Sequence, residues 1–333
     1  MNFNLDKSTV FLTLHGSHAY GLNTPESDYD FRGVACPPIG AFTSPFNHFE
    51  QSQGAHDFVE DIAKNKLPGF GPNDDTKDCT IFSIQKFVKL ASDCNPNIIE
   101  LLFMPDRCVL RTSEAWEYLV SHRDGFVSLK AKFTFSGYAF AQLKRITNHK
   151  KRGDNKPVKP TREAFGLPRE KLGGTEFINS ILHIQNDKSV VLGDELVERA
   201  KNEKRYNEAM REWKSYETWL KERNKKRAAL EAKFGYDCKH ASHLVRLLRM
   251  GEEILSTGKV NVDRTDIDAE ELTAIKNNGI WSYEHLMEWT DMMDEKLSTL
   301  YSENPVGLSK KPAIKKIEKA YNETISRFYS TDR

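Results

Sequence analysis

A short apolar segment, a Gly-Ser pair and two spaced aspartates follow one another near the start of the chain. Residues 9–14 (TVFLTL) are rich in β-branched and apolar side chains, and Gly16-Ser17 ends this predicted strand. Ten residues separate this pair from Asp28, and Asp30 follows with one residue between them. On a strand, two such carboxylates point to the same face and repel each other unless a cation lies between them. The N-terminal region is therefore expected to form a sheet with an acidic face.

This arrangement of residues indicates phosphate chemistry. Hard carboxylate oxygens suit Mg²⁺, which is typically bound by one or two carboxylates together with substrate phosphates. The backbone N–H groups at Gly16-Ser17 and the Ser17 hydroxyl could bind a phosphate. A metal site and a phosphate site so close together are what phosphoryl or nucleotidyl transfer by two metal ions requires.

The segment resembles the DNA polymerase β-like nucleotidyltransferase superfamily, whose pattern is Gly-Ser, a spacer and Asp-x-Asp. It is most similar to a branch of predicted nucleotidyltransferases from phages and bacteria, some of them associated with RNA ligases. The block that carries the resemblance is SDYDFRG, which begins at Ser27 and includes Arg32. Similar blocks occur at residues 78–90, 95–103, 136–143 and 235–248. The resemblance implies a reaction class and does not imply a substrate.

A third carboxylate is expected to share the second metal ion and to orient the attacking hydroxyl. Asp78 is the first choice, because it opens the strand predicted at residues 80–83 and lies in a block similar to the family. Glu100 is the alternative third carboxylate. If it does not bind metal, Glu100 is expected to be an ordinary charged residue on a helix surface. Asp78 could instead only end its strand.

The predicted helix after Asp237 carries a candidate phosphate-binding face. Lys239, His243 and Arg246 follow a spacing that places them on one side, next to an apolar stripe at residues 241, 244, 245, 248 and 255. The alternative is a solvated basic face with one packed histidine. Since this block is similar to the family, we expect contact with the nucleotide, as we also do for Ser27 and Arg32. Zinc binding by His240 and His243 is not expected.

The rest of the chain divides by composition. An irregular insertion is expected at residues 37–77, and Ser83 and Asn95 are expected to begin helices. The chain is predicted to be mainly helical after about residue 113, with a basic loop at 147–173 and a long charged helix at 195–233. One apolar stripe on that helix, here called the seam, is expected to pack in the core. It consists of Tyr206, Ala209, Trp213, Tyr216 and Leu220. The predicted class is α+β, with a nucleotidyltransferase domain at 1–115 that contains a small mixed sheet and a helical domain at 116–333.

The composition excludes several classes of protein. The net charge of +1 gives no strong global attraction to nucleic acid, although a local basic groove remains possible. No apolar run reaches membrane length and no signal-peptide pattern is present. The five cysteines form no CxxC pair, which favours free thiols in a reducing compartment over disulfides or a zinc knuckle. We therefore expect a cytoplasmic protein without a membrane partner; nothing in the sequence indicates an oligomeric state.

The predicted function is the transfer of a nucleoside monophosphate to an acceptor hydroxyl, with release of pyrophosphate. Asp28, Asp30 and Asp78 would bind Mg²⁺, with Mn²⁺ as a possible substitute, and ATP is the first choice of donor. The basic stretch at 147–173 favours RNA or tRNA as acceptor over a protein side chain or a small molecule. Two other classes stay open. One is a catalytically vestigial nucleic-acid-binding or RNA-repair accessory protein, and the other is a partner-binding protein of the toxin–antitoxin type.

Overall fold

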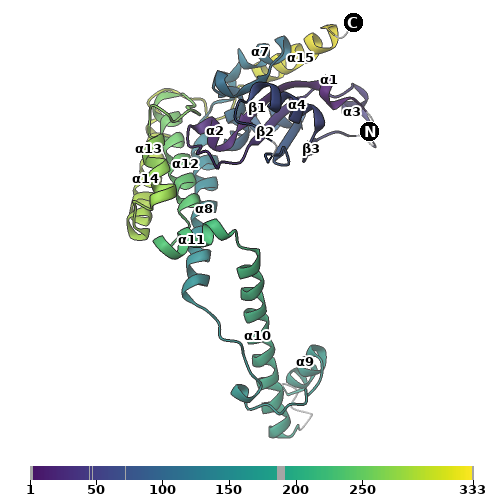
Figure 1. Ribbon diagram of the computed structural model, residues 1–333, viewed down its shortest axis with the longest axis vertical. Helices are drawn as coiled ribbons and strands as arrows, with labels where there is room; N and C mark the ends of the chain where they lie inside the picture. Colours follow the sequence, from purple (N-terminus) through teal and green to yellow (C-terminus); the bar gives the residue numbers. More distant parts are fainter. Residues whose placement is uncertain (1–2, 45, 47, 72, 186–191, 332–333) are drawn as a thin grey trace. The chain divides into compact units, whose positions relative to one another are not determined.

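The computed structural model describes residues 3–44, 46, 48–71, 73–185 and 192–331, which form two compact units (Figure 1). The first unit comprises Met1–Arg145 and Cys238–Arg333, and the second comprises Ile146–Asp237. Helix α8 (Ala131–Asp154) begins in the first unit and ends in the second. The C-terminal helices thus belong to the same unit as the sheet, while a separate catalytic domain at 1–115 stays a prediction.

A five-stranded mixed sheet is the centre of the first unit and confirms the α+β class. Its strand order is β3-β4-β2-β1-β5, and only the β2–β4 pair is parallel. The strands are β1 (Thr9–His15), β2 (Asp30–Ala35), β3 (Gln51–Gln53), β4 (Cys79–Ser83) and β5 (Val109–Arg111). All seven residues of β1 are buried, as its apolar sequence predicts, because this strand has neighbours on both edges.

Twelve α-helices lie wholly or partly in the described residues of this unit. Besides α8 they are α1 (Leu5–Ser8), α2 (Gly16–Tyr20), α3 (Gly40–Thr43), α4 (Asp57–Lys66), α5 (Ile84–Ser92), α6 (Pro96–Ile99), α7 (Glu114–Val120), α12 (Cys238–Thr257), α13 (Ala269–Asn278), α14 (Tyr283–Glu303) and α15 (Ile314–Thr331). Short 3₁₀ turns span Glu100–Phe103, Asp106–Cys108 and Arg123–Phe126. Figure 1 shows α7 beside α15, and α13 and α14 beside α12.

Aromatic packing joins the sheet to its helices. The Phe11 ring of β1 stacks on Trp116 of α7 with ring centroids 4.3 Å apart, and Phe87 of α5 contacts the same indole at 5.1 Å. Helix α5 begins where the sequence predicts, since the Ser83 hydroxyl accepts a hydrogen bond from the Lys86 N–H at 3.2 Å. This core packs α5 and α7 on β1, the strand that leads into the Gly16-Ser17 turn.

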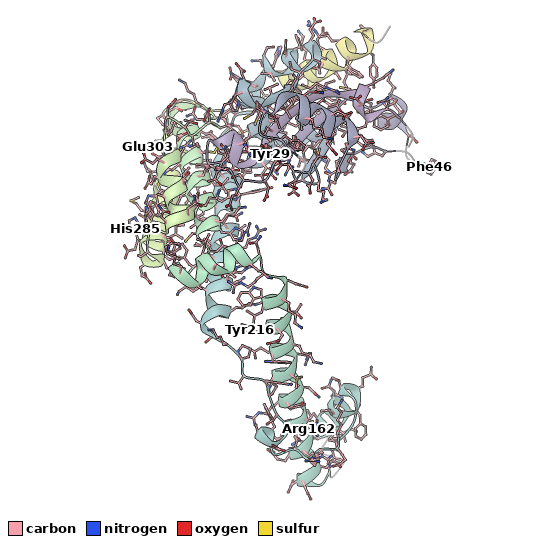
Figure 2. The ribbon with its side chains drawn as sticks, in the orientation of Figure 1. Tyr29, Phe46, Arg162, Tyr216, His285 and Glu303 are labelled. Atoms are coloured by element: carbon pink, nitrogen blue, oxygen red, sulfur yellow. The ribbon has the colours of Figure 1, made fainter. Side chains whose placement is uncertain are left out.

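The second unit contains the end of α8, a 3₁₀ turn (Glu163–Phe165) and three helices. These are α9 (Thr175–Ile184), α10 (Asp194–Glu222) and α11 (Lys225–Phe234). A small apolar core forms between α9 and α10 around Ile178, Ile181 and Ala200. Figure 2 labels Arg162, whose guanidinium forms a 2.5 Å ion pair with the buried Glu203 of α10.

Four local predictions were wrong. The insertion at 37–77 is not irregular throughout, because it contains α3, the edge strand β3 and α4. The basic stretch at 147–173 is helical as far as Asp154, where α8 ends, and the helix expected at 195–233 is broken between α10 and α11. The seam on α10 is not core, since Tyr206, Ala209, Trp213 and Tyr216 are only half-buried and Leu220 is 42% exposed. Among the described residues, no helix is long and apolar enough to cross a bilayer.

Candidate active site

The Gly-Ser turn and the second aspartate of the pair touch each other. His15 at the end of β1 lies opposite Asp30 at the start of β2, so the chain turns into α2 directly beside the Asp30 side chain. Gly16 adopts a φ of +63°, and a Cβ atom placed on it would lie 2.1 Å from Asp30 Oδ2. Glycine is therefore required at this position both for the backbone conformation and for the space that the carboxylate occupies.

Asp78 comes to the same side of the sheet by strand register. The parallel pairing places Phe31 opposite Cys79, and the Phe31 N–H donates to the Asp78 carbonyl at 3.0 Å within this pair. One residue earlier in the same register, Asp30 stands opposite Asp78. Opposed residues of a parallel pair share a face. The structure thus brings Asp30 and Asp78 side by side at the ends of two adjacent strands, as the choice of Asp78 over Glu100 requires.

Asp28 precedes β2 in an exposed loop that is held by local contacts. The Ser27 hydroxyl accepts from the Thr24 N–H at 2.9 Å, so Ser27 closes the turn before the acids. The Tyr29 ring, labelled in Figure 2, stacks on His18 of α2 with centroids 4.7 Å apart. Burial lowers the pKa of His18, against smaller opposing effects that include the nearby Asp30. The loop is therefore packed against α2 while the Asp28 carboxylate stays open to solvent.

Arg32 forms hydrogen bonds where β2 and β4 begin. Its Nη1 atom donates to the carbonyls of Phe31 and Asp78 at 2.8 and 3.0 Å. The guanidinium therefore bridges β2 and the segment before β4. This contact holds the two acid-bearing backbones together, in addition to any interaction that Arg32 makes with a nucleotide.

Two lysines from the C-terminal helices lie near the acids: Lys276 is within electrostatic range of Asp28, and Lys239 is within range of Lys276. Burial lowers the pKa of Lys276 of α13, Lys239 of α12 lowers it further, and Asp28 opposes these effects. Two ammonium groups that repel each other in this way are stabilised when an anion binds between them. The predicted residue Lys239 is exposed and lies in this group, whereas Lys276 was missed.

His243 lies farther along α12 in cationic surroundings. Burial lowers its pKa to about 3, with Arg246, His240 and Arg145 acting in the same direction and Glu100 opposing. Its Nε2 atom has no hydrogen-bond partner among the described residues. A neutral imidazole that is surrounded by cations can accept a proton more readily once an anion is present.

Arg246 and Glu100 do not reach the solvent. They form a buried ion pair of 2.7 Å between Nη1 and Oε1, with side chains 2% and 0% exposed. The Tyr20 hydroxyl donates to Glu100 Oε2 at 2.7 Å, and His15 Nε2 lies 3.3 Å from the same oxygen. Burial opposes ionisation of Glu100, but Arg246 and the contacts from His15 and Tyr20 outweigh it and hold the pKa at about 2.

This buried pair gives both residues a role that the sequence did not indicate. His15 and Tyr20 flank the Gly-Ser turn on either side, so the ion pair links α12 to the turn beside Asp30. The expected exposed face Lys239, His243 and Arg246 is not present as such, because Arg246 points into the interior. No local pattern in the sequence could have predicted the pairing of Glu100 with Arg246 or the approach of Lys276 to Asp28.

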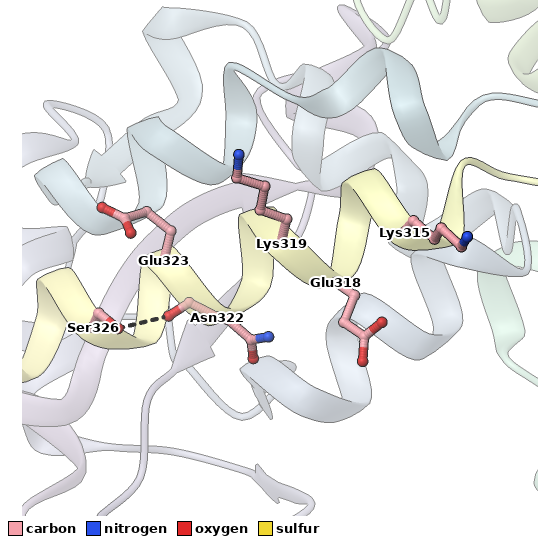
Figure 3. A pocket seen from close by; sticks show the side chains of 6 residues that line it. All are labelled: Lys315, Glu318, Lys319, Asn322, Glu323 and Ser326. Carbon is pink, nitrogen blue, oxygen red and sulfur yellow. Dashed lines mark hydrogen bonds between the residues drawn. The ribbon is translucent and has the colours of Figure 1, made fainter.

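A shallow depression elsewhere has no comparable chemistry. It runs along α15 and is lined by Lys315, Glu318, Lys319, Asn322, Glu323 and Ser326 (Figure 3). The side chains there are mainly exposed, and the contact drawn is the Ser326 hydroxyl donating to the Asn322 carbonyl within the helix. None of the predicted site residues lines it.

Comparisons with known proteins give two similarities. Residues 3–162 match the family model described as "RNA repair pathway DNA polymerase beta family". The chain is also similar to an "uncharacterized 38.9 kDa protein in nrdC-mobD intergenic region" of Enterobacteria phage T4, at 28% identity over 145 residues. That alignment covers 41% of this chain and 38% of the phage protein. No solved structure matches the chain. Over residues 3–162 the chain is thus similar to a DNA polymerase β family of an RNA repair pathway.

Proposed function

We propose that the protein is a metal-dependent nucleotidyltransferase that transfers the nucleoside monophosphate of a nucleoside triphosphate to an acceptor hydroxyl and releases pyrophosphate. The observation that carries this proposal is the packing of Asp30 against the Gly16 turn, with Asp78 directly before the parallel strand β4. The family match agrees with this reaction class.

The three acids would hold Mg²⁺ or Mn²⁺. Their oxygens are hard ligands on one side of the sheet, with Asp28 and Asp78 exposed and Asp30 half-buried, so the donor set fits such ions. When bound, these ions would neutralise the triphosphate and lower the pKa of the attacking hydroxyl.

The remaining residues would position the donor. The backbone N–H groups at Gly16-Ser17 would bind the β- and γ-phosphates, and Ser27 would hold the loop that carries Asp28. Lys239 and Lys276 would bind phosphate oxygens, because a bound anion relieves the repulsion between the two ammonium groups. His243 lies one turn farther along α12 than Lys239. The α-phosphorus would then be attacked in line, with no covalent intermediate on the protein.

The proposed acceptor is RNA or tRNA, and ATP is the proposed donor. The support for RNA is the description of the matching family together with the basic segment of the second unit. Some of its cations are already engaged, since Arg162 pairs with Glu203 and Lys159 lies over the Trp213 ring at 5.3 Å. Lys151, Lys156 and Lys171 are exposed cations of the same segment that would contact phosphates.

The test is a transfer assay with each α-³²P-labelled nucleoside triphosphate, Mg²⁺ and total cellular RNA. The parent chain is compared with Asp28→Asn and Asp30→Asn, which keep the shape of each side chain and remove its charge. Asp61→Asn is the matched control, because Asp61 is an exposed acid on α4 away from the strand ends.

Label that moves to RNA in the parent and in Asp61→Asn, but falls about a thousandfold or more in the other two variants, supports the whole proposal. Pyrophosphate release without labelled RNA keeps the reaction class and replaces RNA by a small acceptor. Turnover that survives in Asp28→Asn and Asp30→Asn, or that is absent with every donor and metal, contradicts the proposal and favours a binding role.

A further inference from the structure

A second cluster of potential metal ligands lies in the second unit, apart from the acids of the sheet. It consists of His149 near the end of α8, Glu231 on α11 and Asp237, which immediately precedes α12. One ligand atom of each residue lies within 4.8 Å of the other two. Residues from three separate segments therefore converge on one point.

The distances suit a small cation with nitrogen and oxygen ligands. His149 Nδ1 lies 3.2 Å from Glu231 Oε1 and 3.9 Å from Asp237 Oδ2. Bond lengths of about 2.0–2.2 Å in a tetrahedral site place neighbouring ligand atoms roughly 3.3 Å apart. The His149 and Glu231 atoms already have that spacing, and a small shift of the Asp237 carboxylate toward His149 would bring its Oδ2 atom to it from 3.9 Å.

The surroundings hold the ligands in place. The side chains of Asp237 and Glu231 are 1% and 10% exposed, whereas that of His149 is 29% exposed and leaves a path for an ion. Arg223 pairs with Oε2 of Glu231, which orients the carboxylate and leaves Oε1 toward His149. The Trp219 ring lies edge-on to the His149 ring, with centroids 5.9 Å apart, and covers one side. Contacts of this kind around a ligand shell fix its geometry.

We propose that His149, Glu231 and Asp237 form a binding site for a divalent transition-metal ion, with Zn²⁺ as the fitting ion. An imidazole with two carboxylates favours zinc-like ions over Mg²⁺ or Ca²⁺, whose sites are built from oxygen alone. Three protein ligands leave one position for water. Since α8 leads into the second unit and Asp237 ends it, the bound ion would fasten together the first and last segments of that unit.

The test uses the full-length chain with Asp28→Asn and Asp30→Asn, so that the acids of the sheet do not compete for metal. The metal-free protein is titrated with Co²⁺, whose visible absorption reports nitrogen and oxygen coordination, and Zn²⁺ is then added. His149→Ala and Asp237→Asn are made in this background. His122→Ala is the matched control, because His122 contacts the Tyr118 carbonyl and belongs to no such cluster.

The expected result is a visible band that saturates at about one Co²⁺ per chain, is removed by Zn²⁺, and persists in His122→Ala. The affinity should fall at least tenfold in His149→Ala and in Asp237→Asn. If circular dichroism shows that either variant does not fold, the quenching of Trp219 fluorescence by Co²⁺ tests the proposal instead. The quenching must then occur in the background protein and be lost in Trp219→Phe. Absence of the band, or a band that both ligand variants retain, overturns the proposal.

Discussion

Replacement of Gly16 by alanine tests whether the carboxylate of Asp30 needs the space beside the Gly-Ser turn. The added Cβ would lie 2.1 Å from Asp30 Oδ2 and 3.0 Å from its Cγ, so the carboxylate must move by roughly 1 Å to reach a normal contact. Alanine at the φ of +63° adds about 1 kcal/mol of backbone strain. The fold should survive this cost, because the clashing atom is the end of a side chain.

The consequence for activity should be much larger than the consequence for stability. A displacement of about 1 Å in a positioned group costs on the order of 100-fold in rate. Gly16→Ala should therefore lower nucleotide turnover about 100-fold and weaken Mn²⁺ binding, while the free energy of unfolding falls by only about 1–2 kcal/mol. Turnover is followed by pyrophosphate release, metal affinity by Mn²⁺ titration, and stability by denaturant unfolding.

The chain supplies a matched control for this substitution. Gly21, at the end of α2, has a φ of +70°, and its Cβ would lie 2.3 Å from the Thr265 hydroxyl. Gly21→Ala thus imposes the same backbone strain and a similar clash away from the acids. It should lower stability to a similar extent and leave metal affinity within about threefold of the parent.

Two results would refute the reasoning. One is a Gly16→Ala protein with parental turnover and parental Mn²⁺ affinity. The other is an equal loss of both in Gly21→Ala, which would assign the effect to strain. Combining Gly16→Ala with Asp30→Asn gives a third check: if glycine acts through the carboxylate, the double variant should be no slower than Asp30→Asn alone.

Further predictions concern the buried pair and the lysines. Glu100→Gln should cost about 3–5 kcal/mol in denaturant unfolding at pH 7, because it leaves Arg246 charged and unpaired, and Glu100→Gln with Arg246→Met should recover part of the loss. Since the pKa of Glu100 is lowered to about 2 and that of His243 to about 3, both groups bind more protons when unfolded. The free energy of unfolding should therefore decline as the pH falls below 6.5 because of His243, and below 4.5 because of Glu100. His243→Gln should flatten the decline between pH 6.5 and 4 by up to about 1.4 kcal/mol per pH unit. An unchanged slope of the free energy of unfolding against pH in this variant would contradict the assignment. Lys276→Met should raise the KM for the nucleoside triphosphate about tenfold with little change in kcat, whereas Lys296→Met on α14, which pairs with Glu252, should change neither.

The parts of the fold that follow from short-range patterns were predicted correctly. The apolar run of β1, the Ser83 cap of α5 and the buried stripe of α12 all depend on neighbouring residues. The segment 37–77 was misjudged because its elements bury little: α4 has only Val59 and Ala63 buried, and β3 is a three-residue edge strand. Such elements are stabilised by their partners, which a local pattern does not contain.

The misplacement of Arg246 has a more specific physical cause. The spacing of Lys239, His243 and Arg246 indicates one polar face only if the helix has a solvated side along its whole length. Helix α12 packs on α13 and α14, and twelve of its twenty residues are buried, including all of residues 244–248, so the turn that carries Arg246 has no such side. A charged residue there must find a partner inside the protein, and Glu100 supplies it from 146 positions away in the sequence. The same burial that removes Arg246 from the surface connects α12 to His15 and Tyr20. Lys239, which is exposed in the first turn of the helix, is therefore the residue of that block for which we propose contact with a phosphate.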